Sequence, residues 1–114
     1  MTAEGLAKLL GAEILAEGNL EGVIRSCLVC DVISQAMAGG RRGMAWITVQ
    51  ANMNALAASV MTDAACLIFP AGIRPEEDVL QRAQKENVTL LAAAQSAFDL
   101  AGRMYEAGLR GEEQ

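Results

Sequence analysis

Residues 64–92 read AACLIFPAGIRPEEDVLQRAQKENVTLLA and contain one complete strand–helix–strand unit. The apolar run 64–69 predicts a buried strand, which the Pro-Ala-Gly turn at 70–72 ends. Pro75 stands at the expected first helical position and three acidic residues follow it. This pattern predicts a helix start, because the first turn of a helix favours proline and negative charge. The helix is expected to end before residues 88–92, which predict the next strand.

The same alternation continues on both sides of this unit. Further helices are expected over residues 2–10, 32–38, 53–61 and 97–104, and further strands over 12–16, 23–30 and 44–49. Asp31, Asn52 and Ser96 each stand where a side-chain oxygen caps the following helix. Strands that alternate with helices imply right-handed crossovers. The sequence therefore predicts an α/β fold, a three-layer α/β/α sandwich around a mostly parallel sheet of about four to five strands built from consecutive βα units.

The distribution of apolar residues gives three more predictions. The segment 23–30 is nearly all apolar, which favours a strand that is covered on both faces. In the helix that Asn52 begins, the spacing predicts an inward stripe, formed by Met53, Leu56, Ala57, Val60 and Met61. The chain is also very apolar for its size, so methionines are available for an adaptable interface between two copies, namely Met37, Met44, Met53 and Met61.

Composition limits the domain count and the partners. With 114 residues, 53% of them hydrophobic, the chain is expected to form one domain over residues 1–109, followed by a polar, frayed tail over 110–114. A net charge of -5 with scattered basic residues argues against nucleic acid as a partner. No apolar run approaches the ~20 residues of a membrane span, and the first residues lack the pattern of a signal peptide. We therefore expect no membrane association and a cytoplasmic location.

Catalysis is not expected. The chain has no histidine, so no histidine can serve as base, metal ligand or phosphoryl acceptor, and no hydroxyl or thiol has a plausible base. Cys27 and Cys30 have the spacing of a redox or metal pair. On a strand, however, positions i and i+3 face opposite sides of the sheet, so both are expected to be core residues, as is Cys66. We expect no cofactor and no metal site.

Polar residues that follow the expected strands suggest a binding site. Gln50, Asn52 and Asn54 follow one strand, and Gly72 and Arg74 follow the next. The carboxyl ends of parallel strands lie at one edge of a sheet, and ligands bind there where the strand order reverses. These five residues are the candidate ligand-binding site. The alternative is that Asn52 only caps a helix, Gly72 only relieves a turn and Arg74 is solvated.

Two long stretches resemble the DRTGG domain family. Residues 64–80 follow its pattern of an apolar strand, a glycine and an acidic helix start after proline, and residues 83–91 follow its next strand. The opening residues 6–15 and Phe98 also fit, so the resemblance spans residues 3–108. It implies a DRTGG-like domain that is similar in fold to the amino-terminal domain of HPr kinase/phosphorylase. It further implies a regulatory, non-catalytic role and a tendency to pair with itself.

The chain departs from the family pattern in two loops. The charged polar loop that gives the family its name falls near residues 48–52, where this chain has neutral amides, and the Thr-Gly-Gly of the family is Pro-Ala-Gly at 70–72. The preferred hypothesis is a self-associating regulatory module that senses a small anionic metabolite or nucleotide, with a protein partner as a further option. The alternative is an accessory subunit of an HPr kinase-like phosphotransfer enzyme that acts with a separate catalytic chain.

Overall fold

The computed structural model describes residues 1–112 of the chain and contains alternating helices and strands. The helices are α1 (Ala3–Leu10), α2 (Ile33–Gly39), α3 (Met53–Thr62), α4 (Glu77–Lys85) and α5 (Ala97–Glu106). The strands are β1 (Glu13–Ala16), β2 (Ser26–Val29), β3 (Met44–Ile47), β4 (Cys66–Phe69) and β5 (Leu90–Ala92). The predicted order of elements is confirmed. The last two residues of the expected tail, 113–114, lie outside the described residues.

The five strands form one sheet in the order β1-β5-β4-β3-β2. Strands β2 to β5 are parallel to their neighbours, whereas β1 runs antiparallel to β5, with Glu13 opposite Ala92. The prediction of a mostly parallel sheet is therefore confirmed. The prediction that residues 23–30 form a strand covered on both faces is wrong, because β2 is the edge strand and Val23 and Val29 are exposed.

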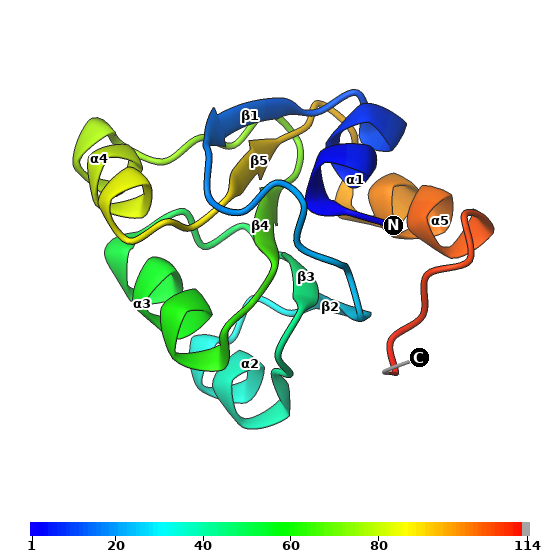
Figure 1. Cartoon of the computed structure of the whole chain (residues 1–114), viewed down its shortest axis with the longest axis horizontal. Coiled ribbons are helices and arrows are strands. Elements are labelled where there is room, and N and C mark those ends of the chain that lie inside the picture. Colours follow the sequence, from blue (N-terminus) through cyan, green and yellow to red (C-terminus); the bar gives the residue numbers. More distant parts are fainter. Residues whose placement is uncertain (113–114) are drawn as a thin grey trace.

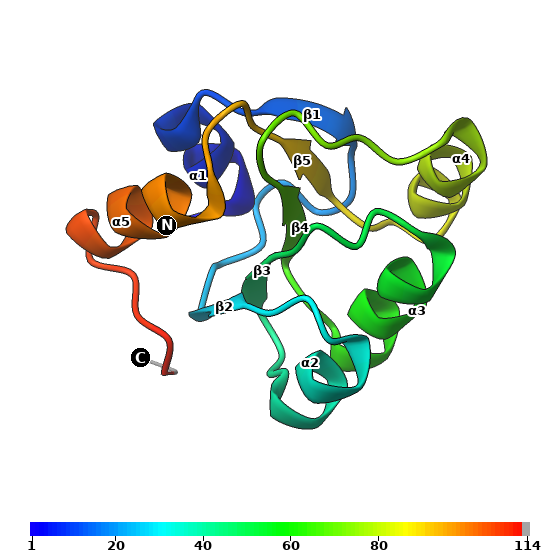
Figure 2. The same cartoon turned by 180° about the vertical axis from the view of Figure 1, so that it is seen from behind.

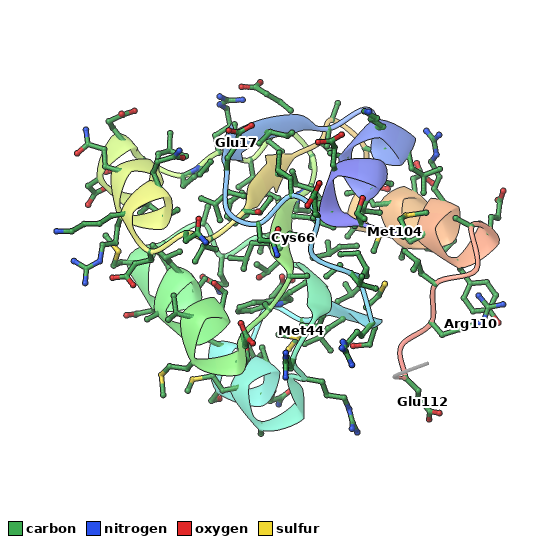
Figure 3. All side chains as sticks on the ribbon, in the orientation of Figure 1. Glu17, Met44, Cys66, Met104, Arg110 and Glu112 are labelled. Carbon is green, nitrogen blue, oxygen red and sulfur yellow. The ribbon has the colours of Figure 1, made fainter. Side chains whose placement is uncertain are left out.

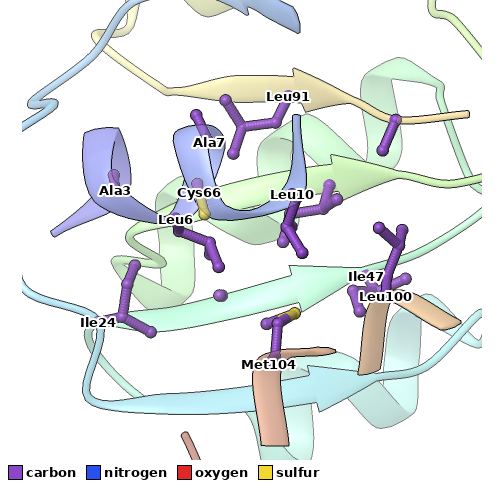
Figure 4. Close-up of a cluster of buried hydrophobic side chains, with 13 residues drawn as sticks. Ala3, Leu6, Ala7, Leu10, Ile24, Ile47, Cys66, Leu91, Leu100 and Met104 are labelled. Atoms are coloured by element: carbon purple, nitrogen blue, oxygen red, sulfur yellow. The ribbon is translucent and has the colours of Figure 1, made fainter. Parts of the chain in front are cut away.

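Helices cover both faces of the sheet, as the two views in Figure 1 and Figure 2 show. Helices α1 and α5 pack on one face, and α2, α3 and α4 pack on the other. Successive strand residues alternate between the two cores: Ile47 and Ile68 face α1 and α5, whereas Trp46 and Leu67 face the other helices. Figure 4 shows the first core, where side chains of α1 and α5 meet those of the strands. This is the predicted three-layer sandwich.

The segments that follow the four parallel strands change face between β4 and β5. Each connection from β2 to β5 passes through α2, α3 or α4, so all three lie on the same face. The segment after β5 instead leads to α5 on the opposite face. The loops that follow β4 and β5 therefore leave two neighbouring strands in opposite directions, which is the arrangement that opens a crevice in α/β sheets.

Two of the three predicted helix caps are confirmed. The side chain of Asn52 accepts a hydrogen bond from the backbone of α3, and that of Ser96 accepts one from α5. Asp31 does not cap α2, whose first flanking residue is Val32. Its carboxylate is instead used by the end of β3, where it accepts hydrogen bonds from Thr48 Oγ1 (3.1 Å) and the backbone N–H of Val49 (2.9 Å). Tertiary contacts between neighbouring strands thus replace the local cap.

Two other local predictions need correction. Helix α4 begins at Glu77, two residues later than expected, because Glu76 is extended and acts as the capping position. The predicted inward stripe of α3 is wrong except for Leu56: its buried residues are Ala55, Leu56, Ala58 and Ser59, and Met53, Ala57, Val60 and Met61 are exposed. Small side chains beside Leu56 allow α3 to approach the sheet closely, and Met53, Val60 and Met61 turn outward.

The four methionines predicted to be available for an interface differ in burial. Met44 is buried between the sheet and α2, so it cannot contact a second copy (Figure 3). Met37, Met53 and Met61 are exposed. The interface prediction is therefore wrong for Met44 and stays open for the other three.

Candidate functional site

A recess of about 290 Å³ lies at the carboxyl ends of β4 and β5. Four segments form its walls: the end of α1, the start of β1, the loop after β4 and the loop after β5. The lining residues are Gly11, Glu13, Gly72, Arg74, Ala92, Ala93 and Ala94. Apart from Glu13 and Arg74, every lining residue is glycine or alanine, so the walls are small and uncharged. The recess coincides with the place where the connections leave the sheet on opposite faces.

Backbone hydrogen bonds fix the two loops against each other. The N–H of Ala93 donates to the carbonyl of Phe69 (3.0 Å), and the N–H of Gly72 donates back to the carbonyl of Ala93 (3.0 Å). Ala71 and Gly72 both have a left-handed backbone, with φ values of 57° and 74°. A glycine at the second position relieves this turn, because left-handed backbone is costly for residues with a Cβ. The turn directs the chain toward Arg74 at the mouth of the recess.

Arg74 forms an ion pair with Glu13 across the recess. Arg74 Nη1 donates to Glu13 Oε1 (3.0 Å), and Nη2 donates to Oε2 (3.1 Å), so the guanidinium and the carboxylate meet at two points. These hydrogen bonds, with the positive charge, hold the pKa of the Glu13 carboxyl below its usual range. The same contacts raise the pKa of Arg74. Both side chains are more than half exposed, so solvent screens the pair.

The other three predicted site residues lie after β3. Gln50 Nε2 donates to the carbonyl of Asp31 (3.0 Å), and Asn52 Nδ2 donates to Gln50 Oε1 (3.0 Å). The Asn52 Oδ1 atom accepts from the backbone of Ala55, so these amides already have partners. Asn54 is exposed in the first turn of α3. The helices that follow β3 and β4 both lie on one face, so the strand ends do not diverge here.

The structure thus brings Gly72 together with Arg74, and Gln50 together with Asn52. The described hydrogen bonds and ion pairs of residues 1–112 do not join the two groups. Sequence reasoning missed Glu13, which enters the recess because β1 is antiparallel to β5 and begins where β5 ends. The only sequence signal for Glu13 was its position at the start of a short extended segment, which does not reveal its neighbour.

Of the side chains that line the recess, only Glu13 and Arg74 are ionisable, and they pair with each other. The recess offers one cation and small walls, which suits the binding of an anion better than proton transfer or nucleophilic attack. Elsewhere among residues 1–112, no group of three or more cysteine and acidic side chains is arranged to hold a metal ion. No helix in this part of the chain is long and apolar enough to cross a membrane.

The cysteines lie as the strand geometry predicts. Cys27 packs against the core under α1 and α5, and Cys30 packs against the core on the opposite face. Burial raises the pKa of the Cys27 thiol to about 11 and that of the buried Cys66 thiol to about 12, so neither is an activated nucleophile. All three thiols are free.

Residues 5–107 match the DRTGG domain family. The chain belongs to the DRTGG domain family. This DRTGG domain is also similar to a solved structure that contains the CBS and DRTGG domains of the regulatory region of Clostridium perfringens pyrophosphatase, complexed with the activator diadenosine tetraphosphate. The similarity has a TM-score of 0.76 at 16% sequence identity and covers 90% of this DRTGG domain chain. It spans 45% of the regulatory-region chain in that structure, less than half its length. The search of curated proteins found no match to this chain in sequence.

Proposed function

We propose that this DRTGG domain is a non-catalytic regulatory module that binds a small anionic ligand, a nucleotide or a phosphorylated metabolite, in the recess at the ends of β4 and β5. The observation that carries the proposal is the placement of Arg74 beside Gly72 at the point where the segments after β4 and β5 diverge. A guanidinium at that point is suited to phosphate or carboxylate, which it binds through two parallel N–H groups.

Two further observations support this role. The structurally similar pyrophosphatase segment is a regulatory region that was solved with a nucleotide activator. That ligand is a polyanion, which agrees with a site built around an arginine. The chain also has three free thiols, which agrees with the reducing conditions of the cytoplasm, where we place the module.

The proposal is tested by a thermal-shift screen of adenine and guanine nucleotides, sugar phosphates and coenzyme A esters at millimolar concentration. A ligand that binds only the folded chain at 100 times its Kd stabilises it by about 2.7 kcal/mol, which raises Tm by several degrees. We expect Arg74→Ala to abolish the shift. Arg103→Ala is the matched control, because Arg103 is exposed on α5, outside the recess. A shift that survives Arg74→Ala would contradict the proposed site.

Gln50, Asn52 and Asn54 stay a separate prediction, which the same screen tests with Asn54→Ala. Asn54 is the most informative of the three, because it is exposed and no helix cap depends on it. A reduced shift in Asn54→Ala would extend the site toward the end of β3. An unchanged shift would restrict the site to the recess around Arg74.

We also propose that the module self-associates. An apolar groove of about 350 Å³ between α3 and α4 supports this, with exposed Met53, Val60 and Met61 along it. Sedimentation velocity at micromolar concentration tests it: the wild type is expected to sediment as a dimer and Met61→Glu as a monomer. Phe98→Glu, the same change at an exposed apolar residue of α5, serves as the control. A monomeric wild type would contradict self-association. The alternative role as an accessory subunit of a phosphotransfer enzyme stays a prediction.

A further inference from the structure

In the recess, the carboxylate of Glu13 lies where the anionic group of the proposed ligand would bind. The two oxygens of Glu13 lie 3.0 and 3.1 Å from the two terminal nitrogens of Arg74. A guanidinium presents this edge to phosphate and carboxylate ligands, because its parallel N–H groups match two oxygens of the anion. The Nη1–Nη2 edge of this guanidinium is therefore occupied by a side chain of the same protein.

The topology explains why an acidic side chain reaches this point. Strands β2 to β5 are parallel, so they all end at the edge of the sheet that carries the recess. Strand β1 is antiparallel to β5 and begins at that edge, with Glu13 opposite Ala92. Its first side chain thus stands beside the loop after β4, although 61 positions separate Glu13 from Arg74 in the sequence.

The remaining walls offer no second anion-binding side chain. The other lining residues are glycines and alanines, and Arg74 is the single cation among the lining residues. The N–H groups of Gly72 and Ala93 are already hydrogen-bonded to backbone carbonyls. An anion that meets Arg74 end-on, through both Nη1 and Nη2, must therefore take the position that Glu13 occupies.

We propose that Glu13 is an internal competitor that occupies the anion subsite of Arg74 in the ligand-free chain, and that a ligand binds by displacing it. This inference rests on the proposed function and narrows its ligand. The ligand carries a phosphate or carboxylate group that meets Arg74 at two points, on a body small enough for a recess of about 290 Å³. Its binding breaks the contact that ties the start of β1 to the loop after β4.

The competition is measured by titrating inorganic phosphate, the smallest anion with the required geometry, into the full chain in 0.15 M NaCl. Amide NMR signals of Gly72 and Ala94 report occupancy of the recess, and the side-chain carboxyl carbon of Glu13 reports its release. The variants are Glu13→Gln, Arg74→Ala and Glu86→Gln. Glu86 is the matched control because it forms an exposed ion pair with Arg82 (3.1 Å) on α4, away from the recess.

We expect Glu13→Gln to bind phosphate about two- to fivefold more tightly than the wild type, the gain expected when a solvent-screened ion pair no longer competes. Glu86→Gln removes the same charge and is expected to match the wild type, because salt screens charges beyond about 8 Å. Arg74→Ala is expected to lose the response. The Glu13 carboxyl signal is expected to move as phosphate saturates the wild type.

Each other outcome has a distinct meaning. If Glu13→Gln and the wild type bind equally and Arg74→Ala does not bind, the anion site holds and the competitor role is overturned. If Glu86→Gln gains as much affinity as Glu13→Gln, the effect is one of net charge and the competitor role is again overturned. The proposed function itself fails if phosphate moves no signal in either the wild type or Glu13→Gln. It fails also if phosphate moves the amide signals of Arg74→Ala as far as those of the wild type.

Discussion

The packing of α5 against the sheet can be tested by Leu100→Ala. Leu100 is fully buried in the core that α1 and α5 share, so the shorter side chain leaves a cavity that its neighbours fill only in part. Substitutions of this kind cost about 3 kcal/mol. This is a large fraction of the free energy of unfolding of a domain, which is roughly 5–15 kcal/mol. We expect the free energy of unfolding to fall by about 3 kcal/mol and Tm to fall by roughly 12 °C.

Urea unfolding followed by tryptophan fluorescence measures the change, because Trp46 is the single tryptophan and is fully buried. Phe98→Ala is the matched control on the same helix: Phe98 is 85% exposed, so its removal should change the free energy by less than about 0.5 kcal/mol. A loss below about 1 kcal/mol for Leu100→Ala, or an equal loss for Phe98→Ala, would refute the packing of α5 that places the recess at the end of β5.

Three further predictions concern the packing or hydrogen bonding of single residues. Gly18→Ala is expected to cost about 1–3 kcal/mol in urea unfolding, because its Cβ would clash with the backbone carbonyl of Asn87. Asp31→Ala is expected to cost about 1–2 kcal/mol, because two hydrogen-bond donors at the end of β3 lose their acceptor; a cost near zero would show that water replaces it. The pKa of the thiol is raised to about 12 in Cys66 and to about 11 in Cys27, so both should resist thiol reagents at pH 8 until the chain unfolds. Because unfolded thiols ionise near pH 9 and the folded ones do not, the free energy of unfolding should decrease as pH rises above 9, and a constant value there would contradict this.

The elements could be predicted from the sequence because their signals are local. The apolar run at 64–69 and the acidic helix start near Pro75 depend on neighbouring residues only, and the structure has β4 and α4 in those places. The incorrect predictions concern residues whose position depends on contacts with residues far away in the sequence. Asp31 turns to the end of β3 instead of capping α2, and α3 packs on Ala55 and Ala58 instead of its methionines.

The same reasoning could predict only part of the candidate site. Gly72 and Arg74 could be found because they follow a strand, and every strand of a parallel sheet ends at the same edge. The strand order could not be read from the sequence, so nothing separated these residues from Gln50 and Asn52 after β3. Glu13 was hidden for the same reason, since its place opposite Ala92 depends on an antiparallel pair between segments at the two ends of the chain.

That antiparallel pair also constrains the order of folding. Strands β2 to β5 each pair with the next strand in sequence, so they can assemble one after another with short loop closures. Strand β1 pairs only with β5, the last strand to be synthesised, and α1 packs beside α5. Strand β1 therefore has no partner strand until nearly the whole chain exists, and we expect its pairing with β5 to be the late step of folding, the one that closes the recess.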